Sequence, residues 1–128
     1  THGLESMREQ IDVFSGMSLE DQVVLLRDTL KSQRQLPGIM EELTGLYLRR
    51  DLAGLVALSE QYRSEDVRVH RELMDRLLTR RNHAMAKRMA EHLREGNAFI
   101  AIGALHLPGE QGVLRLLSDA GYRVSPVY

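Results

Sequence analysis

His106 is the residue of this sequence best suited to chemistry, because it follows a short apolar run that ends in a glycine. The run, residues 98–102, is typical of a strand buried on both faces, and Gly103 ends it. A neutral imidazole in a loop of this kind can bind a metal ion or act as a general base. The alternative is a histidine that only hydrogen-bonds the loop backbone, and the sequence leaves both open.

Charged residues elsewhere in the chain could complete a site with His106. Glu5 precedes an expected helix, so its carboxylate either projects into a site or only interacts favourably with the helix dipole. Arg80 and Arg81 are neighbours in a long expected helix, and one of them could hold a carboxylate or phosphate through two hydrogen bonds. For Arg80 and for Arg81, the alternative is an ordinary surface arginine.

The other histidines are less clear candidates than His106. His2 could be a further ligand. The sequence places the remaining histidines, His70, His83 and His92, on solvated helix faces.

Several well-known kinds of site are absent from the sequence. It contains no His-Glu-x-x-His, no Gly-x-Ser-x-Gly and no Walker or dinucleotide-binding glycine pattern. The lack of cysteine excludes disulfides and thiolate metal ligands. A net charge of −1 gives no reason to expect a nucleic-acid partner. No apolar run approaches the roughly 20 residues of a transmembrane helix.

The sequence predicts a helix-rich α/β fold that would position these residues. Its 128 residues are expected to form a single domain. Residues 1–95 are expected to be mostly helical. Residues 96–128 predict a strand, a helix and a second strand, with the strands at 98–102 and 122–127. Such a crossover forms a parallel sheet, so the helical part would be a long insertion before a small parallel sheet. His106 would then lie at the carboxyl end of a strand, where open α/β sheets bind their ligands.

Three segments together resemble the TraB/PrgY/GumN family, which includes the TIKI-type metalloproteases. Residues 3–6, Gly-Leu-Glu-Ser, resemble the family's acidic Gly-Leu-Glu-Thr segment. Residues 77–82, Leu-Leu-Thr-Arg-Arg-Asn, resemble a family helix that carries an arginine. Residues 103–112, from Gly103 to Gly112 with His106 between them, resemble the family's second Gly-x-x-His motif, and residues 121–124 resemble the strand after it.

The resemblance implies that Glu5, Arg81 and His106 are catalytic, that His106 and Glu5 are metal ligands, and that the motif is supported by further residues. These supporting residues are Asn82, Gly103 and Gly109. The implied cofactor is a divalent ion such as Mn²⁺, Co²⁺ or Zn²⁺. An earlier Gly-x-x-His of the family has no counterpart here, so the chain resembles the carboxyl-terminal half of such a protein. It is expected to self-associate or to need the other half, and to lack peptidase activity by itself. Bacterial relatives suggest the cell envelope or periplasm.

Three functions remain open at this point. The first is a fragment of a metal-dependent hydrolase, most concretely a peptidase in which a metal-activated water attacks an amide of a peptide or small-molecule substrate. The second is a non-catalytic module of the same family that binds a peptide or small ligand. The third is a helical interaction domain in which His106 is structural.

Overall fold

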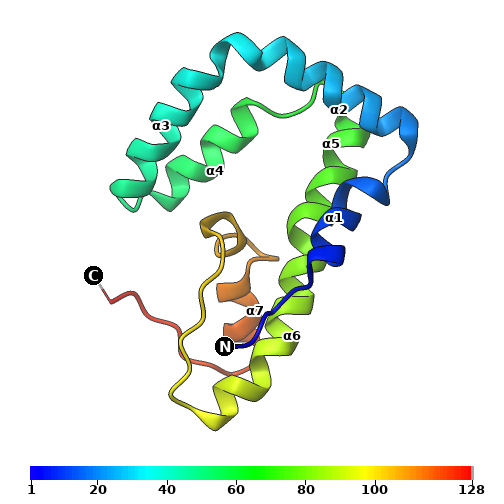
Figure 1. Cartoon of the computed structure of the whole chain (residues 1–128). Helices are drawn as coiled ribbons and strands as arrows, with labels where there is room; N and C mark the ends of the chain where they lie inside the picture. Colours follow the sequence, from blue (N-terminus) through cyan, green and yellow to red (C-terminus); the bar gives the residue numbers. More distant parts are fainter. Residues whose placement is uncertain (128) are drawn as a thin grey trace. The chain divides into compact units, whose positions relative to one another are not determined.

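A computed structural model describes residues 1–127, and every regular element in them is a helix (Figure 1). A three-residue 3₁₀ turn, Gln33–Gln35, separates α2 from α3, and a single π-helical turn, Asp75–Thr79, joins α5 to α6. A further short 3₁₀ turn covers Ala104–His106. The α-helices are α1 (Met7–Ser15), α2 (Leu19–Ser32), α3 (Leu36–Leu48), α4 (Leu52–Gln61), α5 (Val67–Met74), α6 (Arg80–Glu95) and α7 (Val113–Asp119).

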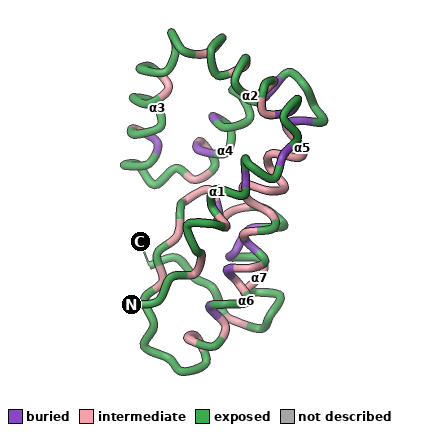
Figure 2. The backbone as a smooth tube through the Cα atoms, turned by 45° about the vertical axis from the view of Figure 1, so that its right-hand side comes forward, coloured by how far each residue is buried: buried purple, intermediate pink, exposed green. Residues whose placement is uncertain are grey.

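The chain divides into two compact units, and the candidate site lies within the first. This unit combines residues 1–10 with the described residues from Asp75 onward, and residues 11–74 form the second unit. The first unit is built on α6, whose buried Met85 and Met89 pack with Val113 of α7. Figure 2 colours the backbone by burial. Leu4 from the amino-terminal segment packs against the same cluster, together with Ile100, Ile102, Leu93 and Leu117.

Local signals in the sequence account for several helix boundaries. The side chain of Ser18 accepts a hydrogen bond from the Asp21 amide at 3.1 Å and begins α2, as expected of an N-cap. Asp51 begins α4 in the same way, accepting from the Gly54 amide at 2.8 Å. α6 ends at Glu95, and the next residue, Gly96, has a φ of +79°, which a residue without a side chain adopts most readily.

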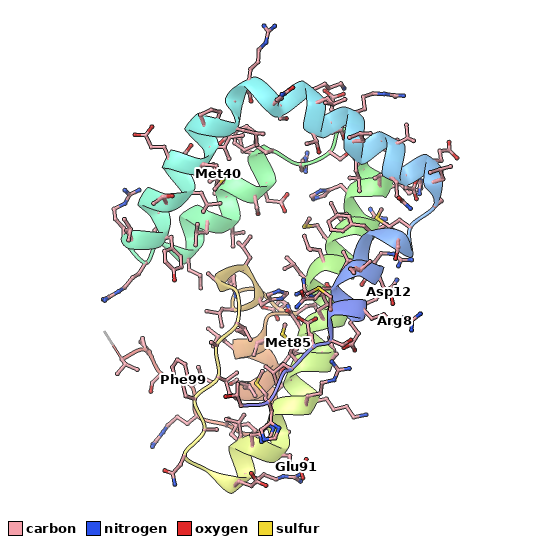
Figure 3. The ribbon with its side chains drawn as sticks, viewed as in Figure 1. Arg8, Asp12, Met40, Met85, Glu91 and Phe99 are labelled. Carbon is pink, nitrogen blue, oxygen red and sulfur yellow. The ribbon has the colours of Figure 1, made fainter. Side chains whose placement is uncertain are left out.

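The predicted α/β fold with a parallel sheet is wrong, because no strand occurs within residues 1–127. Residues 98–102, 122–127 and 1–4 form no helix or strand, so only α7 remains of the predicted strand–helix–strand unit. In the 98–102 segment, Ile100 and Ile102 pack on the α6 cluster, whereas Phe99 is 94% exposed and projects outward (Figure 3). Alternate side chains of this segment thus pack against α6 on one side and face solvent on the other. The segment is not a strand, because no neighbouring strand among residues 1–127 forms hydrogen bonds with its backbone.

The second unit is a set of helices in which α3 packs on α4, and α2 packs on α5. Leu46, Leu55 and Leu58 are buried in the α3–α4 pair. Asp21 of α2 is buried and is bound by Arg68 of α5 through both carboxylate oxygens, while Val69 beside it is completely buried. None of the helices in residues 1–127 has the length and apolar character needed to cross a membrane.

Gly112 offers a direct test of the turn that precedes α7. A Cβ at this position would lie 2.1 Å from the carbonyl oxygen of Pro108 and 2.4 Å from that of Leu107, and backbone atoms cannot move aside as a side chain can. We expect Gly112→Ala to lower the free energy of unfolding by about 1–3 kcal/mol, the usual cost of overpacking.

Gly38, in α3, is the matched control for this measurement. Nothing lies within 4 Å of the Cβ that Gly38→Ala would add, and alanine favours a helix over glycine. Denaturant unfolding should therefore show Gly38→Ala to be neutral or stabilising. Equal stabilities for the two variants would contradict the close approach at Gly112.

Candidate active site

Three segments of the first unit line an open cleft of about 790 Å³ around the predicted site residues. The first is the amino-terminal segment, residues 1–5, and the second is the face of α6 that carries Arg81 and Met85. The third is the extended segment 96–103, followed by His106. Glu5, Arg81 and His106, which are far apart in the sequence, therefore lie on one cleft. Their catalytic and metal-binding roles stay predictions.

Glu5 and Arg81 form a two-bond ion pair that is largely shielded from solvent. Arg81 Nε donates to Glu5 Oε1 at 2.7 Å and its terminal nitrogen donates to Oε2 at 2.8 Å. The other terminal nitrogen of Arg81 donates to the carbonyl oxygen of Leu77 at 3.0 Å, one turn earlier. The hydrogen bonds from Arg81 lower the pKa of Glu5 despite the opposing effect of its burial, so Glu5 is a carboxylate at neutral pH.

The side-chain contacts of Arg80 and Arg81, between which the sequence left a choice, differ. Arg80 Nε donates to Asp75 Oδ2 at 2.6 Å, and the Arg80 side chain is largely exposed. Of these two arginines, only Arg81 lines the cleft. The π-helical turn that ends at Thr79 changes the phase of the helix just before these two residues, and such turns are frequent at functional sites.

A second arginine, Arg88, fastens the amino-terminal segment to α6 two turns after Arg81. Its guanidinium donates to the carbonyl oxygen of Leu4 at 2.6 Å and also binds both carboxylate oxygens of Glu9. The Arg88 hydrogen bonds are the main reason that the pKa of Glu9 falls to about 2. The contacts of Arg88 were not predicted from the sequence, although Ser6-x-x-Glu9 is the pattern of a capping box. The Ser6 amide indeed donates to Glu9 Oε2 at 2.8 Å.

His106 is buried, and a chain of hydrogen bonds fixes its tautomer. Asn82 Nδ2 donates to the backbone carbonyl oxygen of Gln111 at 2.7 Å, which sets the orientation of the Asn82 amide because a carbonyl can only accept. Asn82 Oδ1 then faces His106 Nδ1 at 2.6 Å and must accept a proton from it. Neutral His106 therefore carries its lone pair on Nε2, which forms no hydrogen bond with residues 1–127.

The electrostatic surroundings keep His106 neutral. Burial is the largest cause that lowers its pKa, and the positive charge of Arg81 lowers it further, while the negative charge of Glu5 acts in the opposite direction. His106 therefore prefers its uncharged, deprotonated form at neutral pH. The outcome is an imidazole whose Nε2 is a free base and a potential ligand.

The motif glycines and the other histidines take more peripheral positions. Gly103 lies against the His106 ring, since a Cβ on Gly103 would be 3.4 Å from His106 Cδ2. Gly109 has a φ of +87° in the turn before α7.

The other histidines lie in different parts of the chain. His83 Nε2 lies 2.6 Å from the side-chain oxygen of Gln111. His2 and His92 stack on each other at the rim of the cleft, with their ring centroids 5.1 Å apart, and His70 lies in the second unit, 3.9 Å from Glu60.

The possible metal ligands at the cleft are few. Within residues 1–127, no three side chains of His, Asp or Glu gather closely enough to hold a metal ion. His106 Nε2 is free to coordinate, and its Nδ1–H is held by a protein oxygen, as is usual for metal-ligating histidines. Glu5 keeps lone pairs beyond the two that Arg81 uses. The candidate metal ligands at the cleft are therefore His106 and Glu5, and their binding of a divalent ion stays a prediction.

The comparison with protein families is decisive for the identity of the chain. The model of the TraB/PrgY/gumN family matches residues 1–126. The chain belongs to this family. Comparisons with curated proteins and with solved structures find no match. The TraB/PrgY/gumN match includes all three segments on which the resemblance was based, and it includes Glu5, Arg81 and His106.

The role of Asn82 can be tested by the tautomer of His106. Asn82→Ala removes the acceptor at Nδ1 and should let the proton exchange between the two ring nitrogens, whereas Asn82→Asp keeps an acceptor and should keep the proton on Nδ1. Nitrogen-15 chemical shifts of the His106 ring measure the tautomer directly. His106 shifts that are identical in the native protein and in Asn82→Ala would show that Asn82 does not set the tautomer.

Proposed function

We propose that this cleft is the site of a metal-dependent hydrolase of the TraB/PrgY/gumN family, and that it cleaves peptide bonds in the manner of a TIKI-type peptidase. One observation carries the proposal, namely the unbonded Nε2 lone pair of the neutral His106 beside the Glu5–Arg81 ion pair. A buried imidazole that is held by a second residue and open on its other nitrogen is suited to bind a metal or to accept a proton.

His106 Nε2 and the Glu5 carboxylate are the two groups that would hold the metal. A bound Mn²⁺, Co²⁺ or Zn²⁺ would lower the pKa of a coordinated water and polarise the substrate carbonyl. The ion pair with Arg81 keeps Glu5 ionised, so its carboxylate can serve as a ligand or accept a proton from the attacking water. His106 contributes a neutral nitrogen, which binding to a cation requires.

Arg81 has the donors to hold a substrate. Its three hydrogen bonds to Glu5 and Leu77 leave one N–H on each terminal nitrogen, according to the five donors of a guanidinium. These two N–H groups can donate to a substrate carboxylate or to the oxyanion that forms when water attacks an amide. Arg81 would therefore stabilise negative charge on the substrate while it orients Glu5.

A non-catalytic module that binds a peptide or small ligand is the second candidate. The observation that favours it is the engagement of Glu5, since both of its oxygens already accept hydrogen bonds from Arg81. A carboxylate in a two-bond ion pair is a weaker base than a free one. The same cleft would then bind a ligand through Arg81 and His106 without turnover.

Metal binding should be weak and should depend on His106. Two protein donors are fewer than the three that a catalytic zinc site usually offers. In titration calorimetry with Mn²⁺, Co²⁺ and Zn²⁺, His106→Ala should abolish the binding heat, and His70→Ala should leave it unchanged because His70 lies in the other unit. Tight binding that survives His106→Ala would place the metal site elsewhere.

Hydrolysis of a peptide library separates the two candidate functions. With a divalent metal present, any peptide cleavage should depend on the cleft, so His106→Ala and Glu5→Gln should each lower kcat/KM by about 100-fold or more. Mass spectrometry of the library identifies the cleaved bonds. Peptide binding without turnover, lost in Arg81→Gln, would favour the binding module and would contradict the hydrolase.

A further inference from the structure

Helix α2 carries an apolar stripe on the side that its own unit does not bury. Leu19, Val23, Leu26 and Leu30 are 77, 47, 59 and 60% exposed, respectively. The opposite side of α2 is engaged within the unit, where Arg68 binds Asp21 and Ser64 donates a hydrogen bond to Asp28. The stripe is thus a continuous exposed surface along a helix that is anchored on its other side.

The spacing of this stripe is that of a coiled-coil seam. The four residues follow one another at intervals of four, three and four positions, which is the alternation of core positions in a heptad repeat. Large aliphatic side chains at these positions insert between the side chains of a facing helix. Scattered exposed apolar residues need no explanation, but a complete seam of this kind is suited to a second helix.

The charges along one edge of the stripe indicate which helix that is. Glu20 and Arg27 flank the stripe on the same side, one heptad apart. The charge of Glu20 acts on Arg68 of the same chain, but Arg68 is held by Asp21, so Glu20 itself has no ion pair closer than 4 Å within the described residues. If two copies of α2 pack antiparallel about a two-fold axis, these edges face each other. Glu20 of one copy then lies about 3 Å along the axis from the level of Arg27 of the other, which is within reach of both side chains.

We propose that the α2 stripe is the contact surface between two copies of this chain, which pair antiparallel about a two-fold axis through the middle of the helix. Leu19 of one copy packs against Leu30 of the other, and Val23 packs against Leu26, so all four side chains of the stripe are covered in both copies. Each Glu20 binds Arg27 of the other copy. In a two-fold contact the same surface of each copy faces the other, so this surface must be complementary to itself. The opposite charges of Glu20 and Arg27 on one edge of α2 make it so.

The size of the surface sets the strength of the contact. Stable interfaces bury about 800 Å² on each partner, and four side chains with their flanking residues supply only part of this area. The dimer is therefore weak and depends on protein concentration. A parallel pair is disfavoured, because the edge of α2 that carries Glu20 and Arg27 would then not face the same edge of the other copy.

Sedimentation equilibrium over a range of concentrations tests the contact. The native chain should show a monomer–dimer equilibrium, and Leu26→Lys should raise the dimer dissociation constant by about tenfold or more. Val67→Lys is the matched control, since Val67 is 61% exposed on α5 and lies outside the stripe, and it should leave the equilibrium unchanged. Circular dichroism of each variant verifies that it folds.

Charge reversal tests the antiparallel arrangement. Glu20→Lys alone and Arg27→Glu alone should each weaken the homodimer, because each places like charges opposite one another. An equimolar mixture of the two variants should form a heterodimer more tightly than either forms a homodimer. A monomer at all concentrations, or a dimer that Leu26→Lys does not weaken, would overturn the proposal, and a dimer insensitive to both charge reversals would overturn its antiparallel form.

Discussion

The ion pair between Glu5 and Arg81 is the interaction on which the cleft depends. It joins residues 76 positions apart and brings the amino-terminal segment onto α6, where Leu4 can enter the core of the first unit. Burying two charges is costly unless both are well bonded, and here Arg81 satisfies both Glu5 oxygens and a backbone carbonyl besides. The pair also sets the chemistry of its neighbour, because the charge of Arg81 lowers the pKa of His106 while that of Glu5 raises it.

The orientation of His106 depends on a backbone turn at some distance from the cleft. Gln111 presents the carbonyl oxygen that orients Asn82, and Asn82 in turn holds His106 Nδ1. The turn can place Gln111 there because the next residue is Gly112, where a side chain would collide with the Pro108 carbonyl. The residues after Gly103 therefore act together as a support for one imidazole, which explains why glycine and histidine occur in the same short segment.

The sequence indicated the helical region correctly but wrongly predicted a sheet, because apolar patterns report local helix formation better than strand pairing. Apolar periodicity is a local signal, so it indicated that residues 1–95 are mostly helical, as the structure shows. The run at residues 98–102 is ambiguous, since a short apolar segment can pair with strands or pack on a helix, and in this chain Ile100 and Ile102 pack on α6. Strand pairing is a long-range property that the run alone does not encode.

The candidate site was predictable only in part. Resemblance to the family pointed to Glu5, Arg81 and His106, but composition and spacing could not distinguish Arg81 from Arg80, because the π-helical turn shifts the phase of the helix. The tautomer-setting contact of Asn82 could not be foreseen, as it depends on a turn 29 residues away. The Arg88 clamp was partly visible in the capping-box pattern of Ser6 and Glu9.

The most direct test of this account is the pKa of His106, measured by an NMR titration of its ring protons. The arrangement predicts a pKa below the ordinary value of 6.5, a higher pKa in Arg81→Gln and a still lower one in Glu5→Gln. Both shifts follow from the charges that these substitutions remove. A pKa at or above the ordinary value, unchanged in both variants, would contradict the claim that the Glu5–Arg81 pair and His106 form one site.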